Sequence, residues 1–254
     1  MATTKNIQSV ERAFSILELF QKTGCREHSL KEIAQALDLN KSTAFGLVNT
    51  LASLGCLQQN EENQKYALGL RLLGFANAVK AQDIIVRTVH PYLEKINRKF
   101  GETVHCAVRQ GDGVVYVDKL EATGSIYIST QIGTRNHLHC TGVGKCILAY
   151  LPRPDQERIL NGPLAEVTAH TITDPEQLRA EIARVRTRGY AEDNEEVALG
   201  LSCLAVPVFS GPEKVACAIS VSGMSSQLKA DRENGILEYL LATAEEISRT
   251  FSRA

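Results

Sequence analysis

Histidine and cysteine are the residues of this chain that could most readily bind a metal ion. His137, His139, Cys140 and Cys146 lie within ten residues of one another and supply the nitrogen and sulfur donors that zinc prefers. Their spacing matches no structural zinc pattern, and none of the seven cysteines belongs to a C-x-x-C pair. We therefore expect neither a metal nor another cofactor.

A cysteine nucleophile is the second chemistry to consider. Cys203 or Cys140 could serve if a base such as His105 came within hydrogen-bond reach. None of these residues stands in a recognisable catalytic motif, so we expect no enzymatic activity. A cysteine-dependent hydrolase stays as an alternative.

A third kind of chemistry, contact with a polyanion, is indicated by the stretch "NKSTAFGLVNTLASL" at residues 40–54. Its apolar residues recur at helical spacing and form one face: Ala44, Leu47, Val48, Leu51 and Leu54. The opposite face has one lysine and no acid, and consists of Lys41, Ser42, Thr43, Phe45, Gly46, Asn49 and Thr50. Because solvated helix faces usually carry Glu and Lys, this face favours contact with DNA. The alternative is a small helical subdomain whose face is merely solvated.

The elements around this helix predict a winged helix-turn-helix. An amphipathic helix over residues 7–20 carries the stripe Ile7, Val10, Phe14, Leu17 and Phe20. Ser29 and Glu32 form a capping box that begins a second helix, and Asn40 is the N-cap of the third. Gly55 ends that helix, and a β-hairpin follows over residues 56–69. In such a module the third helix reads the major groove.

The rest of the chain predicts an α+β domain with an antiparallel sheet. We expect helices at 69–82 and 83–100, and strands at 102–110, 113–121, 125–132, 201–209 and 214–223. Further helices are expected at 144–151, 155–160, 174–189 and 233–251, packed on one side of the sheet. The expected domains are residues 1–68, a linker helix at 69–82, and residues 83–254.

Composition sets broader limits. The chain has 254 residues, is 44% hydrophobic and carries a net charge of −1. Lys and Arg outnumber Asp and Glu by 9 to 7 in residues 1–80, whereas acids lead by 22 to 19 in the remainder. This asymmetry suits a DNA-binding head on a mildly acidic body. With no apolar segment of membrane-spanning length and no leader-like start, we expect a cytoplasmic protein without membrane contact.

Nearly the whole sequence resembles the IclR family of bacterial transcription regulators. The segments that carry the resemblance are "SVERAFSILELF", "LKEIAQALDLNKSTAFGLVNTLASLGCL", "KYALGLRLLGF", "LHCTGVGKCILAYL", "RGYAEDNEEVALGLSCLAVPVF" and "ACAISVSG". The resemblance implies a winged helix-turn-helix domain, a linker helix and a GAF-like effector-binding domain. It also implies a homodimer or homotetramer on double-stranded operator DNA, commonly a repressor, that responds to a small organic acid or sugar acid.

The same resemblance proposes DNA-binding residues. They are Ser29, Asn40, Lys41, Ser42, Thr43, Phe45, Asn49 and Lys65. Phe45 could touch a thymine methyl, or could instead be partly buried and support the hairpin. One departure stands out, because Gly46 replaces the arginine that many members carry. A small-molecule-binding protein that has lost DNA recognition is therefore a further alternative.

In the second domain the resemblance implies a carboxylate-binding pocket. The turn at Gly142 and Val143 would offer backbone N–H groups at a helix N-terminus, where an anion is favoured. Ser220 and Ser222 would point to the same face of a strand. The remaining two pocket positions are Asp193 and Cys203, of which Asp193 would accept a hydrogen bond from a ligand hydroxyl or hydrated carbonyl.

Overall fold

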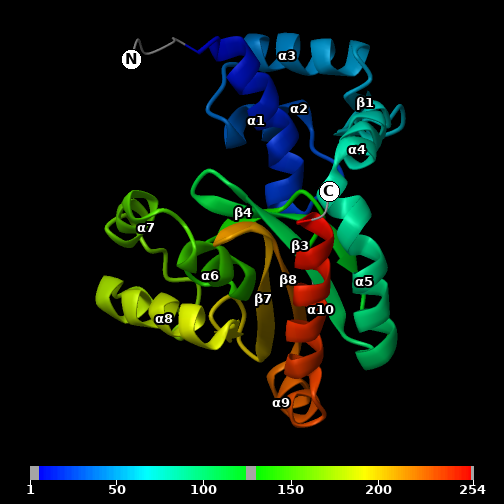
Figure 1. Ribbon diagram of the computed structural model, residues 1–254. Helices are drawn as coiled ribbons and strands as arrows, with labels where there is room; N and C mark the ends of the chain where they lie inside the picture. Colours follow the sequence, from blue (N-terminus) through cyan, green and yellow to red (C-terminus); the bar gives the residue numbers. More distant parts are fainter. Residues whose placement is uncertain (1–5, 124–129, 253–254) are drawn as a thin grey trace. The chain divides into compact units, whose positions relative to one another are not determined.

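The computed structural model describes residues 6–123 and 130–252. The chain divides into two compact units, Met1–Gln82 and Asp83–Ala254. Figure 1 labels their helices and strands in chain order. None of the described helices has the length and apolar character needed to cross a bilayer.

The N-terminal unit has the predicted order of helix, helix, short turn, helix and hairpin. Its elements are α1 (Gln8–Thr23), α2 (Leu30–Ala36), α3 (Lys41–Ser53), β1 (Leu57–Gln59), β2 (Tyr66–Leu68) and α4 (Arg71–Gln82). Strands β1 and β2 pair antiparallel. The predicted winged helix-turn-helix arrangement is confirmed.

Capping side chains determine where α2 and α3 begin. The Ser29 hydroxyl accepts a hydrogen bond from the Glu32 backbone N–H, and the Glu32 carboxylate accepts one from the Ser29 N–H. Asn40 caps α3 through its side-chain oxygen, which accepts from the Thr43 N–H at 2.8 Å. These contacts satisfy backbone donors that a helix start leaves without partners. They also fix the direction in which α3 leaves the turn.

The apolar stripe predicted for the first helix packs into the core only at its C-terminal end, at Leu17 and Phe20. Ile7, Val10 and Phe14 are 69%, 51% and 62% exposed, whereas Ile16 and Leu19 are buried. Phe20, which was predicted to lie in the stripe, is also buried. The helix carries apolar residues on two sides, and the rest of the N-terminal unit covers only one of them.

The C-terminal unit is built on a six-stranded sheet with the order β5-β4-β3-β8-β7-β6, in which every neighbouring pair is antiparallel. Its strands are β3 (Thr103–Gln110), β4 (Gly113–Leu120), β5 (Arg135–His137), β6 (Ala191–Asn194), β7 (Leu201–Gly211) and β8 (Lys214–Met224). Its helices are α5 (Ile84–Phe100), α6 (Gly142–Ala149), α7 (Arg153–Leu160), α8 (Pro175–Arg188), α9 (Ser225–Glu233) and α10 (Ile236–Phe251). The predicted antiparallel α+β domain is confirmed.

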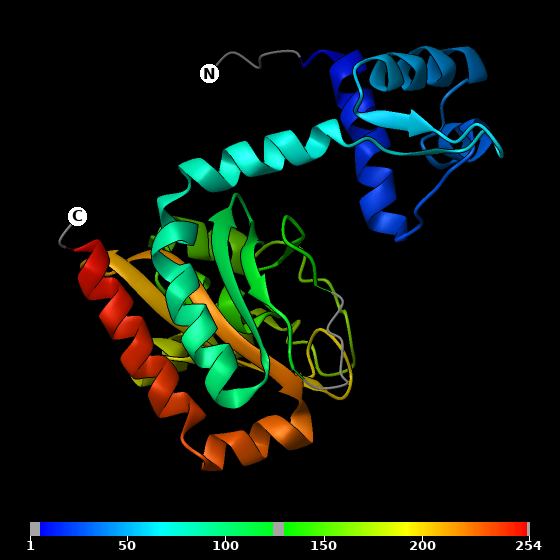
Figure 2. The same cartoon turned by 90° about the vertical axis from the view of Figure 1, so that its right-hand side faces the viewer.

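Helices cover both faces of this sheet, so the prediction of helices on one side is wrong. Figures 1 and 2 show α6 and α8 on one face, and α5 and α10 on the other. Two separate apolar clusters result, one beneath α6 and α8 and one beneath α5 and α10. Both faces are apolar because β8 buries Ile219 and Val221 on one side and Ala218 on the other.

Three short elements were not predicted. Strands β5 and β6 and helix α9 are brief and mostly polar, so they lack a clear apolar period. The strand predicted at residues 125–132 lies mainly outside the described residues, and residues 130–132 do not form a strand.

Candidate functional site

Helix α3 presents the face that the sequence assigned to DNA. Ala44, Val48 and Leu51 are buried against the rest of the unit. Lys41, Ser42, Phe45, Gly46, Asn49 and Thr50 are exposed on the opposite side, and Thr43 is half-buried between them. Leu54, predicted to be in the core, is 48% exposed because it lies at the C-cap of the helix.

In the first turn of α3, side-chain hydrogen bonds hold the residues in place, and backbone N–H groups are left without an acceptor in the helix. The Ser42 hydroxyl donates to the Asn40 side-chain oxygen at 2.8 Å, and the same oxygen caps the Thr43 N–H. The N–H groups of a first helical turn have no acceptor within the helix, so they and Lys41 can meet a phosphate together. Asn40 therefore acts on this surface by orienting its neighbours.

The other candidate DNA-contact residues differ in how exposed their side chains are and in whether they already make hydrogen bonds. Phe45 is 55% exposed, so more than half of its side chain is open to solvent. Ser29 is half-buried, and its hydroxyl is engaged with Glu32. Lys65 is half-buried immediately before β2, on the hairpin. Contact with DNA stays a prediction for every one of these residues.

Gly46 leaves open space on this face. A Cβ built at this position meets no atom within 4 Å. No steric requirement of the fold therefore explains the glycine, and a larger side chain would fit.

The second candidate site is a cavity of about 70 Å³ on the α6 side of the sheet. It is lined by His105, Tyr116, Thr130, Asn136, Thr141, Gly142, Val143, Asp193, Val197, Ala198, Leu201, Ser202, Cys203 and Ser222. The structure thus brings together the predicted residues Gly142, Val143, Asp193, Cys203 and Ser222. We call this space the sheet cavity.

Strand register explains how distant residues meet in the sheet cavity. Asp193 pairs with Cys203 across β6 and β7, and Cys203 pairs with Ser222 across β7 and β8. The three side chains therefore form a row on one face of the sheet. Ser220 lies two residues from Ser222 on the same face, pairs with His105, and is only 1% exposed. Ser220 is not among the residues that line the cavity.

The N-terminus of α6 forms the opposite wall. The Thr141 hydroxyl accepts from the Gly144 N–H at 3.0 Å and donates to the His137 carbonyl at 2.8 Å. Gly142 permits a close approach to the sheet, because a Cβ there would lie 3.0 Å from Cys203 Sγ and 3.1 Å from the Ala205 Cβ. The first turn of α6 consequently lies against the strands that carry Asp193, Cys203 and Ala205.

Burial changes the charge state of the cavity's titratable groups. Burial raises the pKa of Asp193 to about 7, with the nearby Glu196 carboxylate adding to the rise and hydrogen bonds from backbone N–H groups opposing it. Burial, helped by Lys119, lowers the pKa of His105 to about 3. The pKa of Cys203 is raised to about 11 by burial and by Asp193. Near neutral pH the cavity holds a neutral imidazole, a thiol and a carboxyl group that can carry a proton.

These values disfavour the cysteine nucleophile. The reactive form of cysteine is the thiolate. Burial also raises the pKa of Cys140 to about 12, so both candidate thiols are protonated near neutral pH.

The residues proposed as zinc donors make other contacts. His139 Nε2 lies 3.0 Å from the Ala165 carbonyl, and Cys146 Sγ donates to the Ala205 carbonyl at 3.2 Å. In the described part of the chain, no three His, Cys, Asp or Glu side chains are grouped to hold a metal ion.

Sequence reasoning missed one wall of the sheet cavity. His105 and Tyr116 lie 5.0 Å apart between ring centroids, and His105 Nε2 is 3.2 Å from the Thr130 hydroxyl. Their contribution follows from the pairing of β3 with β8 and with β4, which places His105 opposite Ser220 and Ala107 opposite Tyr116. The alternation of apolar and polar residues along each strand does not predict which strands pair.

Comparison with known proteins links both sites to one protein family. Residues 9–61 match the model of the IclR helix-turn-helix domain. Residues 76–249 match the model described as bacterial transcriptional regulator IclR C-terminal.

Curated relatives match almost the full chain. It is 34% identical over 223 residues to the HTH-type transcriptional regulator XynR of Escherichia coli, covering 87% of this chain and 88% of XynR. It is 31% identical over 245 residues to the HTH-type transcriptional repressor AllR of the same species, covering 96% and 90%. An IclR homologue from Microbacterium hydrocarbonoxydans, solved with 4-hydroxybenzoate, has a TM-score of 0.81 at 22% identity, covering 97% and 100%. This last match supports the fold alone.

Proposed function

Because the chain belongs to the IclR family of bacterial transcriptional regulators, we propose that it represses a catabolic operon and senses a small organic acid or sugar acid. The observation that carries the proposal is that one chain combines an acid-free, exposed face on α3 with a small cavity lined by Asp193, Cys203 and the first turn of α6 in its second unit. The relative AllR is named a repressor, and the homologue from Microbacterium binds an organic acid.

Operator DNA is the proposed partner of α3. Lys41 and the open N–H groups of the first turn would bind a phosphate and set the position of the helix. Asn49 and Phe45 lie further along the exposed face, where an amide can read adenine and a ring can touch a thymine methyl. We place the protein in the cytoplasm, where its DNA target lies.

A small carboxylate is the proposed occupant of the sheet cavity. The first turn of α6 supplies N–H donors, and protonated Asp193 removes the repulsion that a second carboxylate would otherwise meet. A cavity of about 70 Å³ exceeds the roughly 10–15 Å³ that a single water needs, so it has room for a small ligand. This modest size favours a short acid over a longer sugar acid.

We further propose that the protein binds DNA as a homodimer, or as a homotetramer of two dimers. Large apolar side chains are exposed on α1, at Val10 and Phe14, and on α4, at Leu73, Phe75 and Val79. An isolated helix as short as α4 is only marginally stable in water, so these side chains favour a second copy as their partner. Two-fold symmetry would also present two α3 helices to successive half-sites.

Titration of fluorescent DNA with the protein tests the DNA assignment. The probe is the intergenic fragment upstream of the protein's own gene, and binding is followed by anisotropy at salt concentrations from about 50 to about 300 mM. Lys41→Ala should weaken binding and reduce the slope of log K against log salt by about 1. Lys229→Ala, which removes an exposed lysine of α9, is the matched control. Unchanged binding by Lys41→Ala would refute the assignment of α3.

Thermal unfolding tests the cavity assignment. We expect one member of a set of small carboxylates to raise the unfolding midpoint of the wild type. Asp193→Ala should lose this response, measured as the shift from its own ligand-free midpoint. Asn194→Ala removes the exposed neighbour on the opposite face of β6 and should keep the response. A full response in Asp193→Ala would count against the cavity as the binding site.

A ligand-binding protein without DNA recognition is the second candidate, favoured by Gly46 alone. The same anisotropy titration distinguishes this candidate from a DNA-binding regulator. Wild-type protein that responds to an acid but shows no salt-dependent DNA binding would support this second candidate, and salt-dependent binding would exclude it.

A further inference from the structure

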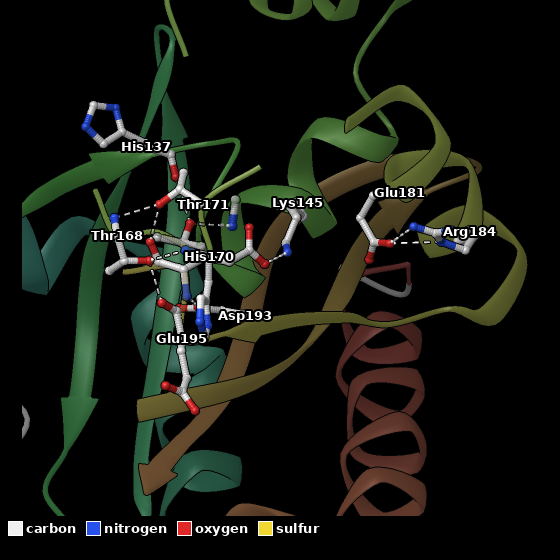
Figure 3. A network of polar contacts seen from close by, with 12 residues as sticks. His137, Lys145, Thr168, His170, Thr171, Glu181, Arg184, Asp193 and Glu195 are labelled. Atoms are coloured by element: carbon white, nitrogen blue, oxygen red, sulfur yellow. Dashed lines mark hydrogen bonds and ion pairs between the residues drawn. The ribbon is translucent and has the colours of Figure 1, made fainter. Parts of the chain in front are cut away.

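A buried ion pair lies next to the sheet cavity without being part of its lining. The Lys145 ammonium donates to the Glu196 carboxylate, and their side chains are only 1% and 5% exposed. Figure 3 shows Lys145 pointing toward the region that holds Asp193, Thr168 and Thr171. The activities proposed above make no use of this pair.

The pair joins the two walls of the cavity. Lys145 follows Gly142 and Val143 within α6, so it belongs to the same helix as the N–H donors. Glu196 lies in the loop between β6 and β7, three residues after Asp193. A link between these two side chains therefore joins α6 to the loop that follows Asp193.

Further hydrogen bonds hold the Glu196 loop on its other sides. The Asp193 carboxylate accepts from the Glu196 N–H at 2.8 Å. The Thr171 and Thr168 hydroxyls donate to the carbonyls of Glu196 and Glu195, each at 2.7 Å (Figure 3). Glu195 adopts a φ of 62°, a left-handed conformation that a residue with a side chain rarely takes without such support. The loop is thus held in one defined shape.

Stability alone is a weak reason to bury these charges. Taking both groups out of water is costly, and an apolar pair of similar volume is often at least as stable. Burial raises the pKa of Glu196 while Lys145 opposes the rise, and Glu196 Oε2 has no hydrogen-bond partner among the described residues. An ion pair differs from apolar contact chiefly in that it is directional and fixes the partners' positions.

We propose that Lys145 and Glu196 are positioning residues that hold the Asp193 loop at a fixed distance from the N–H donors of α6. The proposal rests on the function proposed for the sheet cavity, because it assigns the pair to the effector-binding geometry. Removal of the pair, with packing preserved, should loosen the loop and weaken effector binding without unfolding the domain.

A double substitution separates positioning from stability. Lys145→Met with Glu196→Leu replaces the pair by apolar side chains of similar size. Amide hydrogen exchange is then measured by mass spectrometry in full-length protein. Peptides covering residues 141–147 and 193–200 should exchange at least tenfold faster than in the wild type, while peptides of α10 exchange at the wild-type rate. Wild-type exchange in both cavity peptides would overturn the proposal.

If the double variant fails to fold, a conservative single variant still tests the positioning role by hydrogen exchange. Glu196→Gln keeps the shape and an oxygen acceptor for Lys145 but removes the negative charge. We expect its loop peptide to exchange at least threefold faster, and exchange equal to the wild type would overturn the proposal. The matched control is Arg179→Met with Glu157→Gln, which removes a more exposed pair between α7 and α8 and should leave both cavity peptides unchanged.

Ligand titration distinguishes failure of this proposal from failure of the cavity assignment. Pyruvate, glyoxylate and 4-hydroxybenzoate serve as carboxylate probes for calorimetry. A probe that binds the wild type should bind the double variant at least tenfold more weakly, and equal affinity would overturn the positioning role. If no probe binds the wild type, the cavity assignment loses support, while hydrogen exchange still decides the role of the pair.

Discussion

Helix α3 and the sheet cavity treat charged groups in opposite ways. Lys41 is exposed on α3, where water solvates its charge. Asp193 is 8% exposed in the cavity, and burial raises its pKa to about 7. Interactions at the first site should therefore respond mainly to salt, and those at the second mainly to pH.

The same contrast holds for space around the backbone. A Cβ added to Gly46 on α3 would have no atom within 4 Å, whereas one added to Gly142 would meet Cys203 and Ala205 at 3.0 and 3.1 Å. Replacing glycine by alanine should thus raise the free energy of unfolding at Gly46 and lower it at Gly142. The face of α3 around Gly46 is open, whereas the backbone at Gly142 is packed closely against the sheet.

Gly142→Ala should have the largest effect of the substitutions that separate the two sites. The added methyl group presses on Cys203 and Ala205, so these neighbours or α6 must shift by a few tenths of an ångström. Overpacking of this kind costs about 1–3 kcal/mol of unfolding free energy. Denaturant unfolding measures that loss, and the shift in unfolding midpoint with carboxylates should disappear. DNA binding without effector is the internal control, and a full effector response in this variant would contradict the packed cavity.

Effector affinity should depend on pH through Asp193. Below pH 7 the carboxyl group is largely protonated and presents no repulsion to an anion, so affinity is nearly constant. Above pH 7 the group ionises, and binding must restore its proton. Affinity should then fall by up to about tenfold per pH unit. Calorimetry over a range from about pH 6 to about pH 8.5 measures the slope, which should vanish in Asp193→Asn.

The same pKa predicts a stability difference of defined sign. The pKa of Asp193 rises from 3.8 in the unfolded chain to about 7 in the folded one, so protonated Asp193 favours folding. That contribution is complete below about pH 4 and is lost as pH rises toward about 7. Asp193→Asn should therefore gain stability relative to wild type between about pH 4 and about pH 7, with a constant difference above. A pH-independent difference in denaturant unfolding would contradict the raised pKa.

Gly46→Ala should have the smallest effect. A methyl group in open space removes the helix penalty of glycine, which is about 1 kcal/mol relative to alanine. Calorimetry should show a higher unfolding temperature for the N-terminal unit, opposite in sign to Gly142→Ala. Gly46→Arg should in addition tighten DNA binding and steepen its salt dependence. Destabilisation by Gly46→Ala would mean that this face is already in contact with another part of the protein.

Local signals in the sequence were enough to predict α3 and its surroundings. The Ser29 capping box, the Asn40 cap and the apolar spacing of Ala44, Val48 and Leu51 all act within a few residues, and each is present in the structure. In this unit the sequence did not predict which side of α1 is buried, because Val10 and Phe14 of the apolar stripe are exposed. Periodicity identifies an apolar stripe but not which of two stripes the chain itself will cover.

The sheet cavity was only partly predictable, because it depends on contacts between distant residues. Family resemblance supplied Asp193, Cys203 and the first turn of α6, which the cavity brings together. His105 and Tyr116 could not be assigned without the order β4-β3-β8, which strand alternation leaves undefined. The pairing of Lys145 with Glu196 was equally hidden, since the two lie 51 positions apart in the sequence.

Anisotropy of the labelled upstream fragment, measured with and without small carboxylates, decides whether this chain is an effector-responsive DNA-binding regulator. We predict salt-dependent binding by the wild type and a change of at least tenfold in DNA affinity with one acid. Asp193→Ala should bind the same DNA but lose the change. DNA affinity that no acid alters, or an equal response in Asp193→Ala, would contradict an effector-responsive regulator with its sensor in the sheet cavity.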